Sequence, residues 1–450
     1  MQEPANRRQD HRSTAAPQST EPGAATVTTG AAQAPDVWCT EFELSASNPA
    51  LEVTERPAGA EVRVLARLHR IPLGFVALDE AVVGSAAVRE ALLAEVGEQV
   101  ERHLSEDGVP VDGAGGILEA VRSPCPRPVL HDHVSVVIGT RNRPEHVRDC
   151  LRQLLEVDYT SFDVVVVDNA PDTDETRDAF TEVVGEDTRF RYLRLSRPGV
   201  SRARNAGIAA ATGPLVAFID DDVRVDRFWL QGLVRAFARV PTAVCVTGLV
   251  ATREIVGPEQ RYFDSRVSWA ANLEPRVYHP TSVEPLHPWA AGRFGAGANM
   301  AFRLDAVRVL GGFDVNLGPG TKAKGGEDID LFVRALLAGG DLVYDPAVLA
   351  WHLHRSDPGD LEKQMFGYGV GLTAYLTKHA LRPPVAVEMA RKLPAAVRHV
   401  LYVTQAPQRR GVIGPEARRY RRIELTGMVV GPLYYLRSRL AARTVRSKTP

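Results

Sequence analysis

The chain has 450 residues, of which 44% are hydrophobic and 24% are charged, as expected for a globular protein of two or three domains. Its formal net charge of −1 argues against nucleic acid as a general partner. The four cysteines form no CxxC pair and have no histidine at zinc-binding spacing, which indicates reduced thiols. Because the sequence shows neither a signal peptide nor an apolar stretch of membrane-spanning length, we expect a cytoplasmic protein.

Two regions of different composition precede the central part of the chain. Residues 1–35 consist mainly of Ala, Thr, Gln, Pro and Gly, so we expect them to be disordered. Residues 36–110 predict a small α+β accessory module, with strands over 61–68 and 71–78 followed by a helix over 86–104. No cluster of acids, histidines or cysteines is recognisable in this module, so its sequence indicates no chemistry.

After a Gly- and Pro-rich linker over 111–130, the pattern changes to alternating strands and helices over 131–356. The expected strands lie at 134–138, 162–168, 190–195, 214–220 and 243–250. The expected helices lie at 144–157, 172–184, 200–211 and 226–239. This order predicts an α/β fold with a doubly wound, mostly parallel sheet, whose ligands bind outside the carboxyl ends of the strands. No GxGxxG motif follows the first strand, which argues against a dinucleotide-binding domain.

Three consecutive acids, Asp220, Asp221 and Asp222, follow the buried strand that begins near Pro214. Carboxylates in such proximity repel each other, and a hard divalent cation such as Mg2+ or Mn2+ would relieve the repulsion. Alternation along an extended chain would point Asp220 and Asp222 to the same side and Asp221 to the other. The alternative is a solvated acidic loop before a helix capped by Asp226.

Six segments in this part of the chain, in this order, resemble the family-two glycosyltransferases of the GT-A fold. They are VSVVIGTRNR at 134–143, VVVDN at 165–169, SRARNAG at 201–207, FIDDD at 218–222, GGEDIDL at 325–331 and AWHLH at 350–354. The resemblance covers residues 133–355. It implies transfer of a sugar from a nucleotide-activated donor with inversion, assisted by Mn2+ or Mg2+.

The resemblance also implies roles for individual residues on the donor side. Asp168 would accept a hydrogen bond from the nucleobase, whereas its structural alternative is a helix cap or an Asx turn. Asp220 would contact the ribose or the metal, and Asp222 would be a direct metal ligand. His352 matches the third metal ligand of some relatives, although His354 lies two residues on and the sequence does not choose between them.

The other donor-binding candidates lie on the loops after the expected strands. Thr140 and Arg143 would line the base and the ribose, or Arg143 could be a solvated residue at a helix start. Arg204 and Asn205 lie near the start of a helix, where phosphate oxygens are favoured, although Arg204 could instead pair with nearby acids. The complete predicted donor set is Thr140, Arg143, Asp168, Asn169, Arg204, Asn205, Asp220 and Asp221.

Two acids, Glu327 and Asp328, stand at the start of the helix expected over 329–338 and are candidates for binding the acceptor. In relatives the second acid of this pair deprotonates the acceptor hydroxyl, so the resemblance implies that Asp328 is the general base. Glu327 would orient the acceptor, and Asp330 could face solvent. The structural alternative is that all three acids only stabilise the helix dipole.

Two further segments could border the acceptor or the donor. Residues 257–298 are rich in aromatic side chains that suit sugar faces, although each could equally be part of the core: Tyr262, Trp269, Tyr278 and Trp289. The Gly-rich loop at 311–326 carries Lys322 and Lys324 and could be a mobile lid over the donor or an ordinary long loop.

Residues 357–450 predict a basic helical extension, with helices over 360–378, 385–404 and 415–443. Residues 384–450 contain 14 Lys and Arg against 3 acids, a local excess of +11. This composition suits a cap packed on the central domain, or peripheral contact with the anionic inner face of a membrane.

These patterns together predict a metal-dependent inverting glycosyltransferase. The donor would be a UDP- or dTDP-type sugar, and the acceptor a polysaccharide, a glycolipid or another lipid-linked glycan, or a small natural product. One rival is a nucleotidyltransferase on the same type of fold, although residues 139–144 match its phosphate loop poorly. A second rival is a non-catalytic nucleotide- or sugar-binding module, against which the complete set of acids argues.

Overall fold

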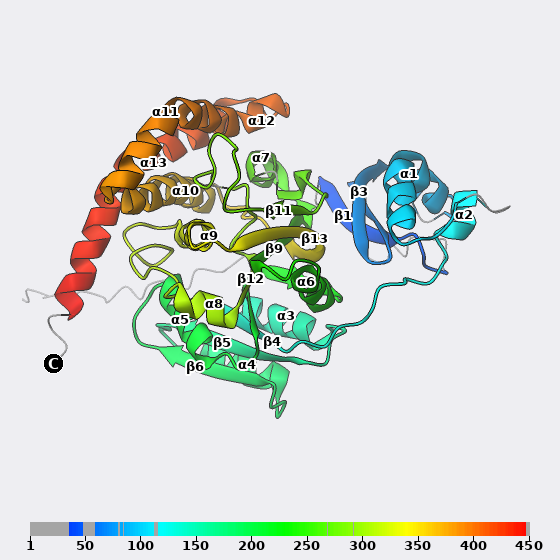
Figure 1. Ribbon diagram of the computed structural model, residues 1–450, viewed down its shortest axis with the longest axis horizontal. Coiled ribbons are helices and arrows are strands. Elements are labelled where there is room, and N and C mark those ends of the chain that lie inside the picture. Colours follow the sequence, from blue (N-terminus) through cyan, green and yellow to red (C-terminus); the bar gives the residue numbers. More distant parts are fainter. Residues whose placement is uncertain are drawn as a thin grey trace, which may run out of the picture. The chain divides into compact units, whose positions relative to one another are not determined.

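The computed structural model describes residues 36–47, 59–79, 82–83, 85–111, 116–267, 269–290 and 292–446 (Figure 1). The disorder predicted for residues 1–35 concerns a segment outside the described residues.

A nine-stranded mixed sheet forms the central region. Its strands are β4 (Val134–Thr140), β5 (Phe162–Asn169), β6 (Phe190–Leu195), β7 (Leu215–Asp220), β8 (Val223–Val225), β9 (Ala243–Thr252), β11 (Arg276–Tyr278), β12 (Asn299–Arg303) and β13 (Asp341–His352). The order is β11-β13-β9-β12-β7-β4-β5-β6, with β8 paired to the end of β13. The β7-β4-β5-β6 half is parallel, as is the β9–β13 pair, which confirms the predicted α/β class.

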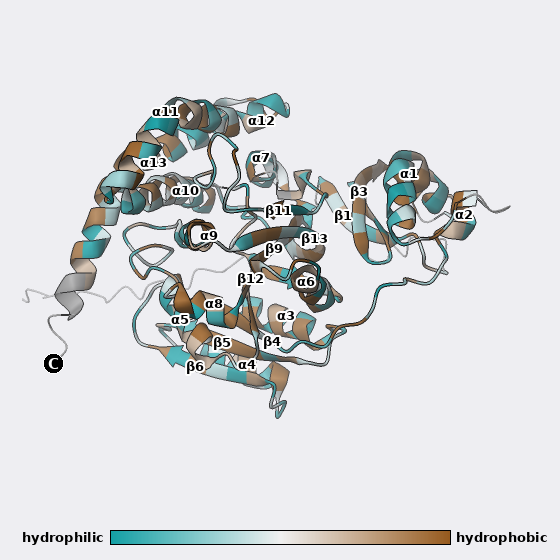
Figure 2. Cartoon of the chain, viewed as in Figure 1, coloured by the Kyte–Doolittle hydropathy of each residue, from teal (hydrophilic) through white to brown (hydrophobic). Residues whose placement is uncertain are grey.

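The parallel half forms because its strands can be buried on both faces. Strand β5 contains Val164–Val167, which are all fully buried (Figure 2). Its alternate side chains enter two separate cores. On one face lie α3 (Pro144–Leu155), α4 (Glu175–Val184) and α6 (Trp229–Arg239). On the other face lie α5 (Val200–Ala210), α8 (Leu304–Val309) and α9 (Glu327–Leu337).

The sheet differs from a simple doubly wound order at one place. Strand β12, which the sequence patterns did not predict, lies between β7 and β9 and is antiparallel to both. The expected strand at 243–250 therefore forms β9 but is not the neighbour of β7. The antiparallel insertion separates the sheet into a half that ends in Thr140, Asp168 and Asp220 and a half that ends in His352.

A second, four-stranded sheet belongs to the N-terminal module. It consists of β10 (Glu254–Ile255), β1 (Val37–Glu43), β2 (Glu61–Leu68) and β3 (Ile71–Leu78), covered by α1 (Val88–Glu106). A short helix, α2 (Gly116–Ala120), follows. The prediction of β2, β3 and α1 is confirmed, whereas β1 was not predicted and β10 comes from the central region.

The interpretation that this module lacks a cluster of chemically active side chains is wrong. His69, at the β2–β3 turn, meets His103 and Asp107 at the end of α1. His103 and Asp107 are 34 and 38 residues away from His69 in the sequence, so no local pattern reveals the cluster.

The module is joined to the central sheet by a buried ion pair and by shared core. Both guanidinium Nη atoms of Arg67 bind the carboxylate of Asp226, at 2.7 and 3.1 Å. Leu65 of β2 packs with Leu249 of β9 and Leu349 of β13. The turn at the end of β2 is thereby fixed to the segment that follows the three acids.

The C-terminal helices are α10 (Pro358–Ala380), α11 (Pro383–Thr404), α12 (Ala406–Arg409) and α13 (Pro415–Arg446), close to the predicted bounds. Helix α13 approaches α10 very closely, because a Cβ on Gly369 would lie 2.0 Å from the carbonyl oxygen of Glu424. Helix α11 exposes most of its large apolar side chains. Figure 2, which colours residues by hydropathy, shows both apolar and polar residues along this helix. Within the described residues, no helix is both long and apolar enough to cross a membrane.

Candidate active site at the carboxyl edge of the sheet

Three neighbouring parallel strands place polar residues at one edge of the sheet. Thr140, the last residue of β4, is in register with Asp168 of β5. Gly139 of β4 is in register with Asp220, the last residue of β7. The predicted donor-side residues therefore meet at the carboxyl ends of adjacent strands, where ligands of open α/β sheets bind.

Asp168 is fully buried at this edge. Its Oδ2 accepts a hydrogen bond from the hydroxyl of Tyr192, but its Oδ1 has no hydrogen-bond partner. Burial raises the pKa of Asp168, although Tyr192 and Arg194 oppose this effect. A buried carboxylate oxygen without a partner is costly, so this site favours a ligand that brings an N–H group.

The three acids do not follow strand alternation, because β7 ends at Asp220 and the chain turns before β8 begins at Val223. Asp221 and Asp222 lie together: Arg143 Nη1 donates to both, at 2.8 Å to Asp221 and 3.1 Å to Asp222. The expectation that Asp221 points away from Asp222 is therefore wrong.

Thr140 and Arg143 both donate hydrogen bonds to the acidic turn, which is the segment Asp220–Asp222. Thr140 Oγ1 donates to the second oxygen of Asp221 at 2.7 Å. Asp221 is buried, which raises its pKa together with the charge of Asp222, while Arg143 opposes the rise. Against the effect of burial, Arg143 lowers the pKa of Asp222, so this carboxylate is available to a cation.

His352 faces Asp222 across the paired ends of β8 and β13. Its Nε2 lies 3.7 Å from Asp222 Oδ1, and its Nδ1 lies 3.0 Å from His354 Nδ1. His354 Nε2 instead approaches the hydroxyl of Thr252 at 2.9 Å and Asp264 at 3.8 Å. The geometry therefore directs His352, and not His354, toward the acids.

The residues at this place fit a divalent cation. A cation with ligand distances of about 2.1 Å could sit between the 3.7 Å-separated Asp222 Oδ1 and His352 Nε2. Burial lowers the pKa of His352 to about 4, so its imidazole is neutral at pH 7. Asp220, the third predicted ligand, does not join them: the ligand atoms of these three residues do not all lie within 4.8 Å of one another.

Asp220 belongs instead to an ionic chain that leads to α9. Arg204 Nη2 donates to Asp220 Oδ1 at 2.9 Å and its Nη1 donates to Glu327 Oε1 at 2.9 Å. The Arg204 guanidinium is buried and also contacts the carbonyl of Gly297 at 3.2 Å. Burial and the neighbouring Asp328 raise the pKa of Glu327 to about 7, against the pull of Arg204.

Asp328 is adjacent to Glu327 but is only half-buried. Its Oδ2 accepts the backbone N–H of Gly297 at 3.0 Å, and its Oδ1 accepts that of Ile329 at 2.8 Å. A Cβ on Gly297 would lie 2.6 Å from Asp328 Oδ2, so only glycine lets the backbone approach this closely. Asp328 is thus oriented by backbone donors at the start of α9.

Two predictions for residues near this ionic chain, Asp330 and Asn205, do not match the structure. Asp330 does not face solvent: it is fully buried and binds Arg334, Lys378 and His379, because α10 packs on this face of α9. The amide of Asn205 both donates to and accepts from the backbone of Phe313, so its side chain anchors the start of the Gly-rich loop. Asn205 is therefore not directed toward the acids in this structure.

The Gly-rich loop at 311–326 is packed and hydrogen-bonded. Leu317 and Ala323 are fully buried, and the hydroxyl of Ser201 donates to the carbonyl of Leu317 at 2.9 Å. Lys322 and Lys324 are exposed. The loop therefore forms a fixed wall beside Glu327 here, with two lysines on its outer side.

Three of the predicted sugar-facing aromatics are buried. Tyr262 packs against Tyr420, the hydroxyl of Tyr278 donates to the carbonyl of Arg293, and Trp289 donates to Glu388. The structure describes no side chain for Trp269. The aromatic-rich segment therefore contributes mostly to packing.

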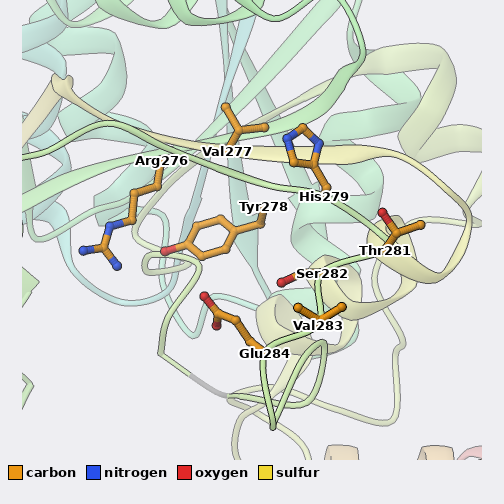
Figure 3. A pocket seen from close by; sticks show the side chains of 8 residues that line it. All are labelled: Arg276, Val277, Tyr278, His279, Thr281, Ser282, Val283 and Glu284. Atoms are coloured by element: carbon orange, nitrogen blue, oxygen red, sulfur yellow. The ribbon is translucent and has the colours of Figure 1, made fainter.

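A separate surface depression of about 600 Å³ lies around β11 and the loop after it (Figure 3). Its lining residues are Arg276, Val277, Tyr278, His279, Thr281, Ser282, Val283 and Glu284. Strand β11 pairs with the beginning of β13, at Tyr344, whereas His352 is at the other end of that strand. The depression is thus remote from the acids and is not the candidate active site.

Two contributors to the site had no signal in the sequence. Tyr192 lies on β6, one strand away from Asp168, and only the parallel pairing of β5 and β6 brings its hydroxyl to the carboxylate. Gly297 contributes only backbone atoms, to Arg204 and Asp328. Neither a motif nor a spacing distinguishes either residue.

Comparison with known proteins agrees with this geometry. The sequence model described as Glycosyl transferase family 2 matches residues 135–307. The pre-mycofactocin glycosyltransferase of Mycobacterium tuberculosis is 30% identical over 250 residues, covering 55% of this chain and 48% of that protein. The succinoglycan biosynthesis protein ExoM of Rhizobium meliloti is 32% identical over 234 residues, covering 50% of this chain and 67% of ExoM.

Among solved structures, a mannosyltransferase of Pyrobaculum calidifontis in complex with GDP-Man and Mn2+ aligns with a TM-score of 0.46 and 20% identity, over 76% of this chain and 96% of that one. The chain spans about half the length of the mycobacterial relative. The family match extends from β4 into α8, and ExoM is matched over two thirds of its length. On these grounds, the chain belongs to glycosyltransferase family 2.

Proposed function

We propose that this chain transfers a sugar from a nucleoside-diphosphate-sugar to an acceptor hydroxyl, with inversion and with Mn2+ or Mg2+ at the donor. The observation that carries the proposal is the buried Oδ1 of Asp168, which lacks a partner at the edge where the acids gather. An N–H of a nucleobase would satisfy this oxygen. Thr140 and Asn169, at the ends of the same strands, would line the base and the ribose.

Asp222 and His352 would hold the cation, which when bound would neutralise charge developing on the departing diphosphate. Arg143 is only partly buried and now pairs with Asp221 and Asp222, so it can exchange these acids for phosphate oxygens. Arg204 is fixed between Asp220 and Glu327 and would position both carboxylates relative to the donor.

On the acceptor side, Asp328 would accept the proton of the attacking hydroxyl. The acceptor oxygen then bonds to the anomeric carbon, and the bond from that carbon to the phosphate oxygen breaks, which releases the nucleoside diphosphate. The two backbone N–H groups on Asp328 hold its carboxylate in one orientation. Glu327 lies beside it and would orient the acceptor.

The relatives suggest the classes of substrate but not one compound. The mycobacterial relative is named for pre-mycofactocin and ExoM for succinoglycan biosynthesis, so the two names point to different pathways. We therefore propose a UDP- or dTDP-type donor and an acceptor that is a polysaccharide, a lipid-linked glycan or a natural product.

We also propose that α11 contacts an anionic membrane surface, where a lipid-linked acceptor would lie. Leu393, Val397 and Leu401 are exposed at four-residue spacing, and Arg391 and Arg398 are exposed beside them. An apolar stripe flanked by arginines suits the interface of an anionic bilayer. Replacing the three apolar residues by serine should reduce co-flotation with phosphatidylglycerol vesicles, and unchanged flotation would contradict the contact.

The experiment that tests the activity measures binding and slow hydrolysis of a panel of UDP-, dTDP- and GDP-sugars, with Mn2+ or with chelator. Wild type should bind one donor in a metal-dependent manner and release its nucleoside diphosphate. Asp222→Ala should lower this turnover about 10²-fold or more, because it removes a cation ligand. Asp168→Asn should weaken donor binding about tenfold or more, because a charged acceptor becomes a neutral amide.

The matched control is Asp149→Asn, which changes an exposed acid on α3 outside the acidic turn. Its donor binding and turnover should equal those of wild type. Release of pyrophosphate instead of a nucleoside diphosphate would support the nucleotidyltransferase. Failure of every nucleotide-sugar to bind would overturn the proposal.

A further inference from the structure

A second cluster of metal-ligating side chains lies in the N-terminal module, away from the acids. His69 is at the β2–β3 turn, and His103 and Asp107 are at the end of α1. Their side chains are 1%, 5% and 4% exposed, so the three groups are buried together. Among the described residues, no other set of three His, Cys, Asp or Glu side chains brings its ligand atoms within 4.8 Å.

The three ligand atoms converge at nearly equal distances. His69 Nδ1 is 2.9 Å from Asp107 Oδ2, His103 Nε2 is 3.1 Å from His69 Nδ1, and His103 Nε2 is 3.2 Å from Asp107 Oδ2. A cation about 2.1 Å from each of these atoms would see them about 90–100° apart. That angle lies between octahedral and tetrahedral values, so ordinary ligand distances need no rearrangement.

The outer contact of His69 shows which of its ring nitrogens points inward with a lone pair. His69 Nε2 is 2.9 Å from the carbonyl oxygen of Ser123, which only accepts, so this nitrogen carries a proton. In a neutral His69, Nδ1 is then unprotonated, and its lone pair faces the carboxylate of Asp107. Two acceptors at this distance repel each other, and a cation between them would relieve the repulsion.

The surroundings resemble the outer contacts of known metal-binding histidines. A histidine that binds a metal commonly donates its other ring N–H to a backbone carbonyl, as His69 does to Ser123. Asp107 keeps a second partner, because Arg127 Nη2 donates to its Oδ1 at 2.9 Å. His103 differs from His69 in its outer contact, because its Nδ1 faces a donor, Arg127 Nη2, at 3.5 Å.

We propose that His69, His103 and Asp107 bind a divalent transition-metal ion of the Zn2+ type, which fixes the turn of the module to the end of its helix. Two imidazoles and one carboxylate form a donor set that zinc uses, whereas Mg2+ prefers oxygen ligands. The site is distinct from the proposed donor-side cation, and the proposal does not depend on the activity.

Such an ion would stabilise a turn that has an unfavourable backbone. His69 and Arg70 have φ angles of 51° and 71°, a left-handed conformation that is unfavourable for residues other than glycine. The same turn reaches the central region, because Arg70 stacks on Phe228 at 3.7 Å and Arg67 binds Asp226. A metal at His69 would therefore also hold the segment that follows Asp222.

The first test is the metal content of untagged, full-length protein after exhaustive dialysis, measured by mass spectrometry. Wild type should retain about one equivalent of zinc, and His103→Gln should lose it. Two controls should keep it: His131→Gln, which changes an exposed histidine, and Asp222→Ala, which changes the donor-side site. Loss of zinc from Asp222→Ala instead would assign the metal to the donor-side acids and overturn the proposal.

A second measurement covers the case in which His103→Gln does not fold. Wild type stripped with a chelator should melt at a lower temperature, recover with Zn2+ but not with Mg2+, and show a Co2+ absorption spectrum typical of nitrogen and oxygen ligands. Protein that purifies without zinc, binds no Co2+ and melts identically with and without chelator would overturn the proposal. The cluster would then be a buried hydrogen-bonded group of His69, His103 and Asp107 that holds no metal.

Discussion

Two clusters of charged and histidine side chains differ in how exposed they are to solvent. At the sheet edge, Asp222 and its partner Arg143 have side chains that are 21% and 36% exposed, so a ligand can reach them. In the module, His69, His103 and Asp107 are buried and held by backbone and arginine contacts. The first arrangement suits a cation that arrives and leaves with a donor, and the second suits a cation that stays.

The partners of the acids explain this difference. Arg143 and Arg204 compensate the negative charge of the acidic turn while no donor is bound. Long side chains can release a carboxylate when phosphate oxygens replace it, and the charges remain balanced. The histidine cluster is fixed by a carbonyl and a helix end, which have no such freedom. Variants at the open edge should therefore change turnover, and variants near the closed cluster should change stability.

The largest effect on turnover should come from Asp328→Asn. An amide cannot accept the acceptor proton, so kcat should fall about 10²–10⁴-fold. Donor binding should be unchanged, because Asp328 contacts the backbone of Gly297 and Ile329 and is proposed to act on the acceptor only. Steady-state kinetics with the identified donor, together with a donor-binding titration, checks both statements.

The control for this variant is the thermal stability, which should fall only modestly, because the single amide oxygen of asparagine keeps one of the two hydrogen bonds that Asp328 accepts from Gly297 and Ile329. If kcat is retained, Asp328 is not the base, and Glu327 becomes the candidate.

The next largest effect concerns the ion pair between Arg67 of the N-terminal module and Asp226 of the central region. Arg67→Met should lower the free energy of unfolding by about 3–5 kcal/mol, because it leaves Asp226 buried without its partner. Chemical denaturation measures this loss. The matched variant Arg63→Met removes a partly exposed arginine of the same strand, whose ion pairs are at 3.9 Å, and should cost about 1 kcal/mol or less. Equal losses in the two variants would show that the buried pair does not join the module to the sheet.

Much of the central fold could be predicted, because its strands are short apolar runs and its helices follow with regular spacing. Val164–Val167, for example, can only be a strand buried on both faces. Strands β12, β1 and β10 were missed because their sequences are short and their position depends on pairing with distant strands. The order of the sheet is a tertiary property that no local pattern contains.

For the candidate site, the positions of residues along the chain could be predicted, but the directions of their side chains could not. Motifs gave the strand-end positions of Asp168, Asp222 and His352, which the structure brings to one edge of the sheet. Directions of side chains were less predictable, because they depend on where a strand stops: alternation failed at Asp221, after the end of β7. Asp330 was misjudged because the packing of α10 against α9 is not visible in either helix alone.

The smallest expected effect concerns Glu327 and pH. The pKa of Glu327 is raised to about 7 in the folded protein from an ordinary value of 4.5, because burial disfavours its charged form. The stabilising contribution of the protonated group is fully present below pH 4.5 and is lost as the pH rises through 7. Glu327→Gln stays neutral, so its stability relative to wild type should rise with pH over this range, by at most roughly 1.4 kcal/mol per pH unit.

Denaturation of both proteins at several pH values between 4.5 and 8 tests this slope. The amide oxygen that Glu327→Gln introduces can still accept from Arg204, so the variant removes the titrating charge and keeps the hydrogen bond. The control pair, wild type against Asp149→Asn, measures the effect of replacing an exposed acid by its amide elsewhere in the same domain. If the Glu327→Gln difference changes with pH no more than that of the control pair, Glu327 is ionised throughout this range. Its salt bridge with Arg204 then outweighs burial, and Glu327 has no proton to exchange with an acceptor near neutral pH.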